Sequence, residues 1–180
     1  MSTLMVGNIV ATIAAMFMLY AGVLKEKKKI LFIQTIQIAL LVASNFILGG
    51  IIGGILNILC IIRNLLSYND KLGLKSKIII TVLSIPFNNK GLLGLLPTVS
   101  TVIYLWLMNT KDVIKFKWLI IFTNFTWLVY DIIILSIVTA VFDFFCILTN
   151  FVAILGIKKD NKKVNTNIEN KEETKEKVGE

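Results

Sequence analysis

The chain has 180 residues, of which 56% are hydrophobic and 17% are charged, and its formal net charge at neutral pH is +8. Soluble domains have about 25% charged residues, so this composition excludes an ordinary soluble protein and indicates a membrane protein. The basic residues lie in short clusters between apolar stretches, with no single patch interleaved with exposed aromatics, so we expect no nucleic-acid partner.

Seven apolar stretches predict seven membrane-spanning helices, because a helix of roughly 20 residues crosses the hydrocarbon core of a bilayer. The expected spans are about 4–24, 30–48, 51–67, 78–88, 92–108, 118–136 and 138–157. The fourth is the shortest, because Pro86 and Asn88-Asn89 interrupt it. The predicted fold class is therefore all-α, a polytopic membrane helical bundle.

Lysine clusters follow every second span. They comprise Lys25 and Lys27 to Lys29, then Lys71, Lys75 and Lys77, then Lys111, Lys115 and Lys117, and finally Lys158 and Lys159. On the other side of the membrane, Lys90 is the one expected lysine. Cytoplasmic loops of membrane proteins are enriched in Lys and Arg, so we expect the N-terminus outside and the C-terminus in the cytoplasm. MSTLMVGNIV carries no charge before its apolar stretch and does not resemble a signal peptide.

Two segments 86 residues apart align without a gap, LNILCIIRNLL (56–66) and FDFFCILTNFV (142–152). The offset relates spans two and three to spans six and seven, and span four has no counterpart. This predicts a 3+1+3 arrangement, with repeat one at 4–67, a linker helix at 78–88 and repeat two at 92–157. Two three-helix units joined by one helix face the same way, as in the parallel repeats of SWEET proteins. Residues 158–180, with seven lysines and six acidic residues, predict a disordered charged cytoplasmic tail after the seven-helix domain 1–157.

The aligned segments also carry matching polar residues. Asn57, Cys60 and Asn64 lie on one helical face, and Asp143, Cys146 and Asn150 repeat that spacing. The preceding spans carry the equivalent pair Asn45 and Asp131. Polar side chains are costly in hydrocarbon and tend to face a bundle interior, so we expect these stripes to converge on a binding site. The predicted substrate-binding residues are Asp131, Asp143, Asn57, Asn64, Asn150, Asn45, Trp127, Arg63 and Gln34.

Four of these residues have a second interpretation. Arg63 either extends toward the cytoplasmic interface or contacts an anionic group. Trp127 shares a face with Asp131 and either lines a pocket or packs in the core. Asp131 and Asp143 either bind a cation, a proton included, or lie close enough to the headgroups to reach water.

Four aromatic residues lie near span ends, which is typical of interfacial anchors: Tyr68, Tyr104, Trp106 and Trp118.

The chain has no histidine, and its two cysteines, Cys60 and Cys146, lie inside apolar helices. This argues against a zinc site and a His-based catalytic triad, and each cysteine is expected to act as a small buried apolar side chain. We expect no enzymatic activity and no metal or other cofactor.

Several short motifs, in order, resemble the YgjV family of bacterial inner membrane proteins. They are KEKKK leading to Gln34, NFILGG (45–50) leading to Asn57 and Arg63, LLPTVST (95–101), Trp127 with Tyr130 and Asp131, and Asp143 with Asn150. The resemblance covers most of residues 22–157 and implies a location in the inner membrane, without a substrate. The topology is also similar to that of SWEET and PQ-loop transporters, although the Pro-Gln motif is absent.

These observations lead to two hypotheses about function. In the first, the protein is a transporter or permease that moves a small polar or cationic solute through a site between two three-helix repeats. In the second, it is a non-transporting membrane protein, such as a regulatory, binding or immunity-type partner, whose polar residues hold helices together. In either case the lipid bilayer is a partner. The protein is either a monomer or a homo-oligomer, and the sequence allows both.

Overall fold

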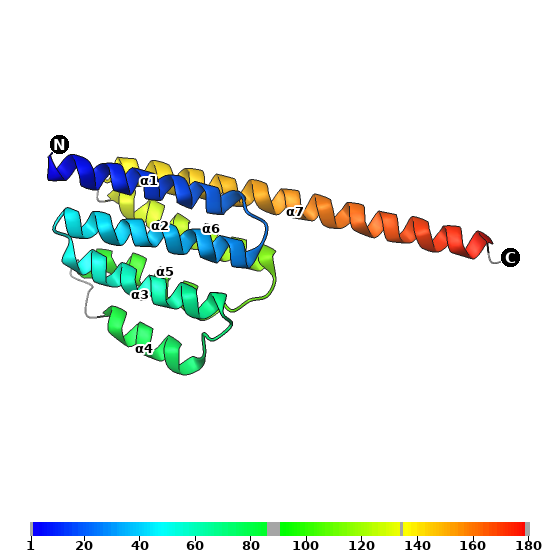
Figure 1. Cartoon of the computed structure of the whole chain (residues 1–180), viewed down its shortest axis with the longest axis horizontal. Helices are drawn as coiled ribbons and strands as arrows, with labels where there is room; N and C mark the ends of the chain where they lie inside the picture. Colours follow the sequence, from blue (N-terminus) through cyan, green and yellow to red (C-terminus); the bar gives the residue numbers. More distant parts are fainter. Residues whose placement is uncertain (1, 86–90, 134, 179–180) are drawn as a thin grey trace.

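A computed structural model describes the backbone of residues 2–85, 91–133 and 135–178 (Figure 1). Side chains are described as far as Lys163, except at 52, 91–95, 97 and 138. Within these residues the chain is all-helical, with seven helices and no strand. The helices are α1 (Thr3–Val23), α2 (Lys27–Ile47), α3 (Ile51–Tyr68), α4 (Leu74–Ser84), α5 (Gly91–Leu107), α6 (Val113–Ile133) and α7 (Ile137–Val178). The prediction of seven helices is thus confirmed for the described part of the chain.

Four helices are long and apolar enough to cross a membrane: Thr3–Val23, Lys27–Ile47, Val113–Ile133 and Thr139–Lys163. Helix α3 and the part of α5 from Thr98 are apolar but shorter. Helix α4 has 11 residues, which at 1.5 Å per residue span about 16 Å, half of a ~30 Å hydrocarbon core. Residues 86–88 of the predicted fourth span lie outside the described residues, so seven full crossings stay a prediction.

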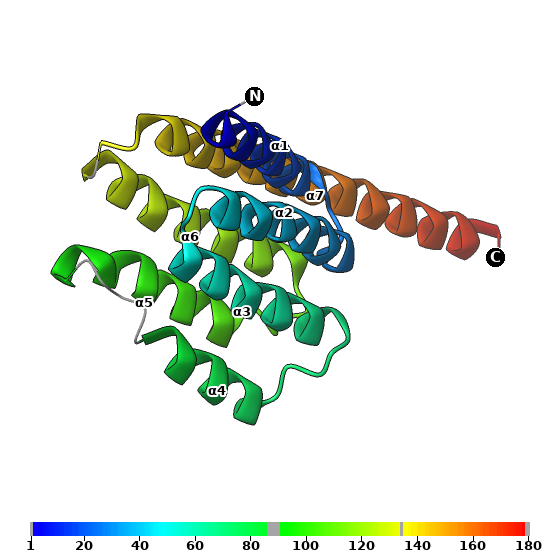
Figure 2. The same ribbon diagram turned by 60° about the vertical axis from the view of Figure 1, so that its left-hand side comes forward.

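The helices pack mainly as antiparallel neighbours in chain order. Helix α2 lies between α1 and α3, α6 lies between α5 and α7, and α1 also packs against α7. Helix α4 touches α3 and α5 only through a few residues. Figures 1 and 2 show α1 to α4 side by side in order, with α7, α6 and α5 behind them. The 3+1+3 arrangement of two repeats stays a prediction.

Short turns produce the antiparallel order. Gly49 has φ = 79°, a conformation that glycine adopts without strain, and it lies in the three-residue turn between α2 and α3. The chain therefore makes a tight turn at Gly49-Gly50. The side chain of Ser2 caps α1 by accepting a hydrogen bond from the Met5 N–H (3.3 Å), and Asp112 accepts from the Ile114 N–H (2.8 Å) at the start of α6.

We call the end of the bundle where α1, α3 and α5 finish and α2, α4 and α6 begin the basic end, because the predicted lysine clusters lie there (Figure 1). The main hydrophobic core also lies toward this end, where Ile30, Leu31, Met108 and Phe116 are fully buried. Elsewhere, large apolar side chains are exposed along every helix, as expected for surfaces that face lipid. Helix α7 continues past the bundle, and the predicted disorder of residues 158–180 in solution stays a prediction.

Candidate functional site

The predicted site residues fall into separate groups, and the first is a pair of acids on α6 and α7. Asp131 lies near the end of α6 and is 6% exposed, and Asp143, six residues into α7, is half-buried. Their side chains interact electrostatically and by a hydrogen bond. The turn that joins the helices is closed by a hydrogen bond from the Ser136 N–H to the Asp131 carbonyl (2.8 Å). Adjacent helices and a short turn therefore bring together two carboxyl groups that the sequence places 12 positions apart.

Trp127 lies one helical turn before Asp131 on α6. Its ring packs edge-on against Tyr130, with ring centroids 5.8 Å apart. Trp127 is 38% exposed, whereas Tyr130 is 7% exposed. The structure therefore places Trp127 beside the acid pair but at the surface of the bundle, and Tyr130 is the aromatic residue that packs inside.

The second group surrounds Arg63 on α3. Arg63 and Asn64 are both buried, and the Arg63 Nε and Nη2 groups donate to Asn64 Oδ1 at 3.2 and 3.1 Å. The guanidinium lies 4.5 Å from the centre of the Tyr104 ring on α5, within the range of a cation–π interaction. The Tyr104 hydroxyl donates to Gln34 Oε1 on α2 (3.1 Å). Arg63 thus points into the bundle, and the extension toward the interface that the sequence allowed is not seen.

The third group surrounds Lys117 on α6, a residue that the sequence analysis assigned to a loop. Lys117 is fully buried and donates to the Gly22 carbonyl on α1 (2.7 Å) and to Asn150 Oδ1 on α7 (3.1 Å). The Asn150 amide donates in turn to the Cys146 carbonyl (2.9 Å). One ammonium group therefore joins three helices. Cys146 is buried as predicted, whereas Cys60 is only half-buried.

The remaining predicted residues, Asn45 and Asn57, lie toward the end opposite the basic end. The Asn45 amide donates to the Leu41 carbonyl of its own helix (2.8 Å). Its Oδ1 lies against the backbone of Gly53, where an added Cβ would come within 2.8 Å. Asn57 is half-buried on α3. Asn45 thus helps α2 pack against α3, and it does so where glycine leaves room.

The polar stripes of α3 and α7 do not face each other across one cavity. Helices α2 and α6 lie between α3 and α7 in both views (Figures 1 and 2). Each stripe instead contacts a cation of its own, Arg63 for Asn64 and Lys117 for Asn150. The structure therefore brings Asp131 to Asp143 and Gln34 to the Arg63 group, and it leaves Asn64 and Asn150 apart.

Three residues with a part in these groups were not predicted. Lys117 was counted with the loop lysines because α6 was expected to begin at 118, although Asp112 before an apolar run is a helix-start signal. Tyr104 was assigned to the interface, but it is 6% exposed and packs under Arg63. Ser67, on the same face as Asn64, is buried and no sequence signal separates it from an ordinary helical serine.

Among the described residues, no three His, Cys, Asp or Glu side chains gather closely enough to hold a metal ion. The acid pair is the group whose carboxylates could contact a cation, and the groups of Arg63 and Lys117 present donors. The chain therefore separates an acidic centre on α6 and α7 from two basic centres near the basic end.

Apolar helices of membrane-spanning length, lipid-facing apolar surfaces and buried polar groups define a polytopic helical membrane protein. The chain belongs to the Imp-YgjV family, described as bacterial inner membrane proteins, whose family model matches residues 5–161. No curated protein and no solved structure gives a significant match to the chain. The family membership agrees with the resemblance noted in the sequence, and it places the protein in the bacterial inner membrane.

Proposed function

We propose that the protein is a small-solute transporter or permease, and that the contact between Asp131 and Asp143 carries this function. Two carboxylates in contact repel each other unless a proton or another cation lies between them. Inside a membrane such a pair is costly, so ionisable residues there commonly mark substrate or ion pathways. The acid pair is accordingly the site of a polar or cationic solute, or of a coupled proton.

The packing of the helices supports this proposal. Helices α1 to α3 pack in chain order, α5 to α7 do the same, and α4 makes few contacts with either half. In this proposal the two three-helix units, joined by one loosely packed helix, rock against each other about the contact of α1 with α7, as parallel repeats do in SWEET proteins. In this proposal the basic end faces the cytoplasm, in keeping with the lysine clusters.

Transport in liposomes tests the proposal. The purified protein is reconstituted, and uptake and counterflow are measured with a panel of small polar and cationic solutes. We expect the Asp131→Asn plus Asp143→Asn variant to lose transport of every accepted solute. A matched control, Asp70→Asn plus Asp160→Asn, removes two exposed carboxylates that form ion pairs with Lys28 and Lys25. Unchanged flux in the first variant would show that the acid pair is not the site.

A second function is favoured by one observation, the satisfied bonding of Lys117. Its ammonium group joins Gly22 of α1 to Asn150 of α7, which is what a purely structural polar group does. If the acid pair is structural too, the protein is a binding or regulatory membrane protein that moves nothing. Labelling of Asn57→Cys and Asp143→Cys by aqueous thiol reagents, in a background without Cys60 and Cys146, separates the two functions. Labelling indicates a hydrated pathway, and complete protection indicates structural packing.

A further inference from the structure

Arg63 is a buried cation with no carboxylate at ion-pair distance among the described residues. Two of its five N–H groups donate to Asn64 Oδ1, and its remaining N–H groups donate to no described residue. A buried charge without a counter-charge is strongly destabilising, even when a neutral amide and an aromatic ring offset part of the cost. Among the described residues, the charge of Arg63 is therefore offset by a neutral amide and an aromatic ring and by no carboxylate.

Two further donors near Arg63 are buried and have no partner. They are the Asn64 amide Nδ2 and the Ser67 hydroxyl, whose residues are 0% and 4% exposed. The orientation of the Asn64 amide is fixed by chemistry, because arginine only donates and the oxygen must therefore face it. Asn64 and Ser67 are three residues apart on α3, so their side chains lie on the same face one above the other. This face thus presents two unused donors beside a guanidinium that has no carboxylate partner among the described residues.

The equivalent asparagine of the other half shows that the unused donor is not a general property of the fold. The Asn150 Nδ2 donates to the Cys146 carbonyl (2.9 Å) and lies 3.5 Å from the Cys146 Sγ. Cys60 occupies the matching position before Asn64, yet the Asn64 Nδ2 makes no such bond. The contact between Arg63 and the Asn64 oxygen keeps the amide turned, so that the nitrogen stays available to an acceptor from elsewhere.

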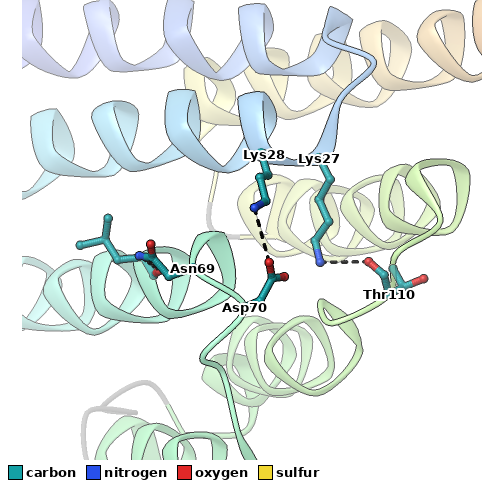
Figure 3. Close-up of polar contacts among 6 residues, drawn as sticks. Lys27, Lys28, Asn69, Asp70 and Thr110 are labelled. Carbon is teal, nitrogen blue, oxygen red and sulfur yellow. Dashed lines mark hydrogen bonds and ion pairs between the residues drawn. The ribbon is translucent and has the colours of Figure 1, made fainter.

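Basic and aromatic side chains connect this place to the basic end. Lys27 Nζ lies 5.4 Å from the centre of the Phe116 ring, and the Phe116 and Tyr104 ring centres are 6.0 Å apart. Tyr104 in turn lies under Arg63. Figure 3 shows Lys27 extending from α2 to the Thr110 carbonyl. Beside it, Lys28 of α2 forms an exposed ion pair with Asp70, which follows the end of α3. The positive charges at this end attract anions toward Arg63.

From these contacts we infer an oxyanion-binding site on α3, in which Arg63, Asn64 Nδ2 and the Ser67 hydroxyl bind a carboxylate or phosphate group. Arginine suits this role because its planar fork matches the oxygens of both groups. The anion comes either from a small solute or from the headgroup of a lipid, and the chemistry of recognition is the same. The site is separate from the acid pair, so it would exist in a protein that transports nothing.

The experiment uses the full chain in neutral detergent, with inorganic phosphate as the first probe. The unfolding temperature Tm is measured at rising phosphate, against chloride at the same ionic strength. A ligand that binds only the folded protein raises Tm, here by about 3 °C when phosphate is well above its Kd. In Asn64→Asp the new carboxylate pairs with Arg63 and takes the place of the anion. We expect this variant to fold and to lose the phosphate response.

Asn150→Asp is the matched control, because it places the same carboxylate beside Lys117 at the equivalent position of the other half. It should keep the full phosphate response. Ser67→Ala removes one donor without adding a charge and should raise the Kd for phosphate about 10- to 150-fold, since a hydrogen bond to a charged group contributes about 1.5–3 kcal/mol. This variant keeps the test decisive if Asn64→Asp fails to fold.

A parallel series with phosphatidylglycerol, added to the micelles and counted by native mass spectrometry, separates the two sources of the anion. A response to phosphate that Asn64→Asp abolishes supports a site for a soluble anion. A response confined to phosphatidylglycerol and abolished in the same way supports a lipid headgroup. The inference is overturned if the wild type responds to neither probe, if chloride acts equally well, or if Asn64→Asp and Asn150→Asp respond alike.

Discussion

Asn64 and Asn150 each accept a hydrogen bond from a buried cation, but only Asn150 also uses its amide nitrogen as a donor. The two residues are 86 positions apart and occupy equivalent places in the two similar segments. The cations differ as well, since Arg63 precedes Asn64 on the same helix and Lys117 reaches Asn150 from a neighbouring one. The amide of Asn150 is thus fully hydrogen-bonded, whereas the amide nitrogen of Asn64 is left without an acceptor.

The hydrogen bond from Lys117 to Asn150 is expected to stabilise the fold. We expect Lys117→Met to lower the free energy of unfolding by about 1–3 kcal/mol, because the Asn150 oxygen then lies buried without a donor. Denaturant unfolding in detergent measures the change. Adding Asn150→Leu should restore most of the loss, since replacing both partners by apolar groups is often nearly neutral. Lys115→Met, at an exposed position two residues earlier, is the control and should change stability by less than about 0.5 kcal/mol.

Gly22 predicts a steric limit on the distance between α1 and α7. A Cβ added at Gly22 would overlap Thr149 Oγ1 and approach Asn150 Nδ2 to 3.1 Å. We expect Gly22→Ala to destabilise the protein by about 1–3 kcal/mol, as overpacking does, and Thr149→Ala to recover part of this loss by removing the nearest atom. Gly73 has nothing within 4 Å of an added Cβ, so Gly73→Ala is the matched control. Equal effects at both glycines would contradict the close approach of the helices.

Tyr104 allows the ring and the hydroxyl to be tested separately. Tyr104→Phe keeps the ring under Arg63 and loses the hydrogen bond to Gln34, so it should cost about 1 kcal/mol of stability. Tyr104→Leu also removes the cation–π contact, so the loss of stability should be larger by a further ~0.5–2 kcal/mol. Tyr68→Phe, at an exposed tyrosine, should be nearly neutral. If the Phe and Leu variants have the same stability, the ring does not hold the guanidinium.

The helices could be predicted from the sequence, and most of the polar contacts could not. Apolar stretches bounded by lysines and glycines locate α1 to α6 and the start of α7 to within about five residues, because length and hydropathy decide which segments enter a bilayer. The end of α7, at Val178, lies beyond the predicted end of the last span at residue 157, because charged residues continue the helix past the apolar stretch. The contact between Asp131 and Asp143 follows from a short turn between adjacent helices. Lys117 was missed because a start of α6 five residues earlier moves a loop lysine into the core.

The pairing between non-adjacent helices had no signal in the sequence. Nothing in the order of residues says that α1 packs against α7, which is what gives Lys117 the Gly22 carbonyl as a partner. Likewise, the position of Tyr104 under Arg63 depends on how α5 rotates about its axis. Apart from the small polar residues Ser100 and Thr101 one turn earlier, the residues near Tyr104 on α5 are apolar, so the amphipathic pattern that would predict a buried face is weak.

The number of crossings predicts the side of the membrane on which each end lies. An odd number of full crossings puts Ser2 and Lys163 on opposite sides, whereas they lie on the same side if α4 stays within one leaflet. In a background without the native cysteines, we expect a membrane-impermeant thiol reagent to label Ser2→Cys in spheroplasts. Lys163→Cys and Asn69→Cys, at the basic end, should react only after permeabilisation. Labelling of Ser2→Cys and Lys163→Cys from the same side would mean that α4 does not cross, and the basic end would then no longer match the cytoplasmic side in both halves.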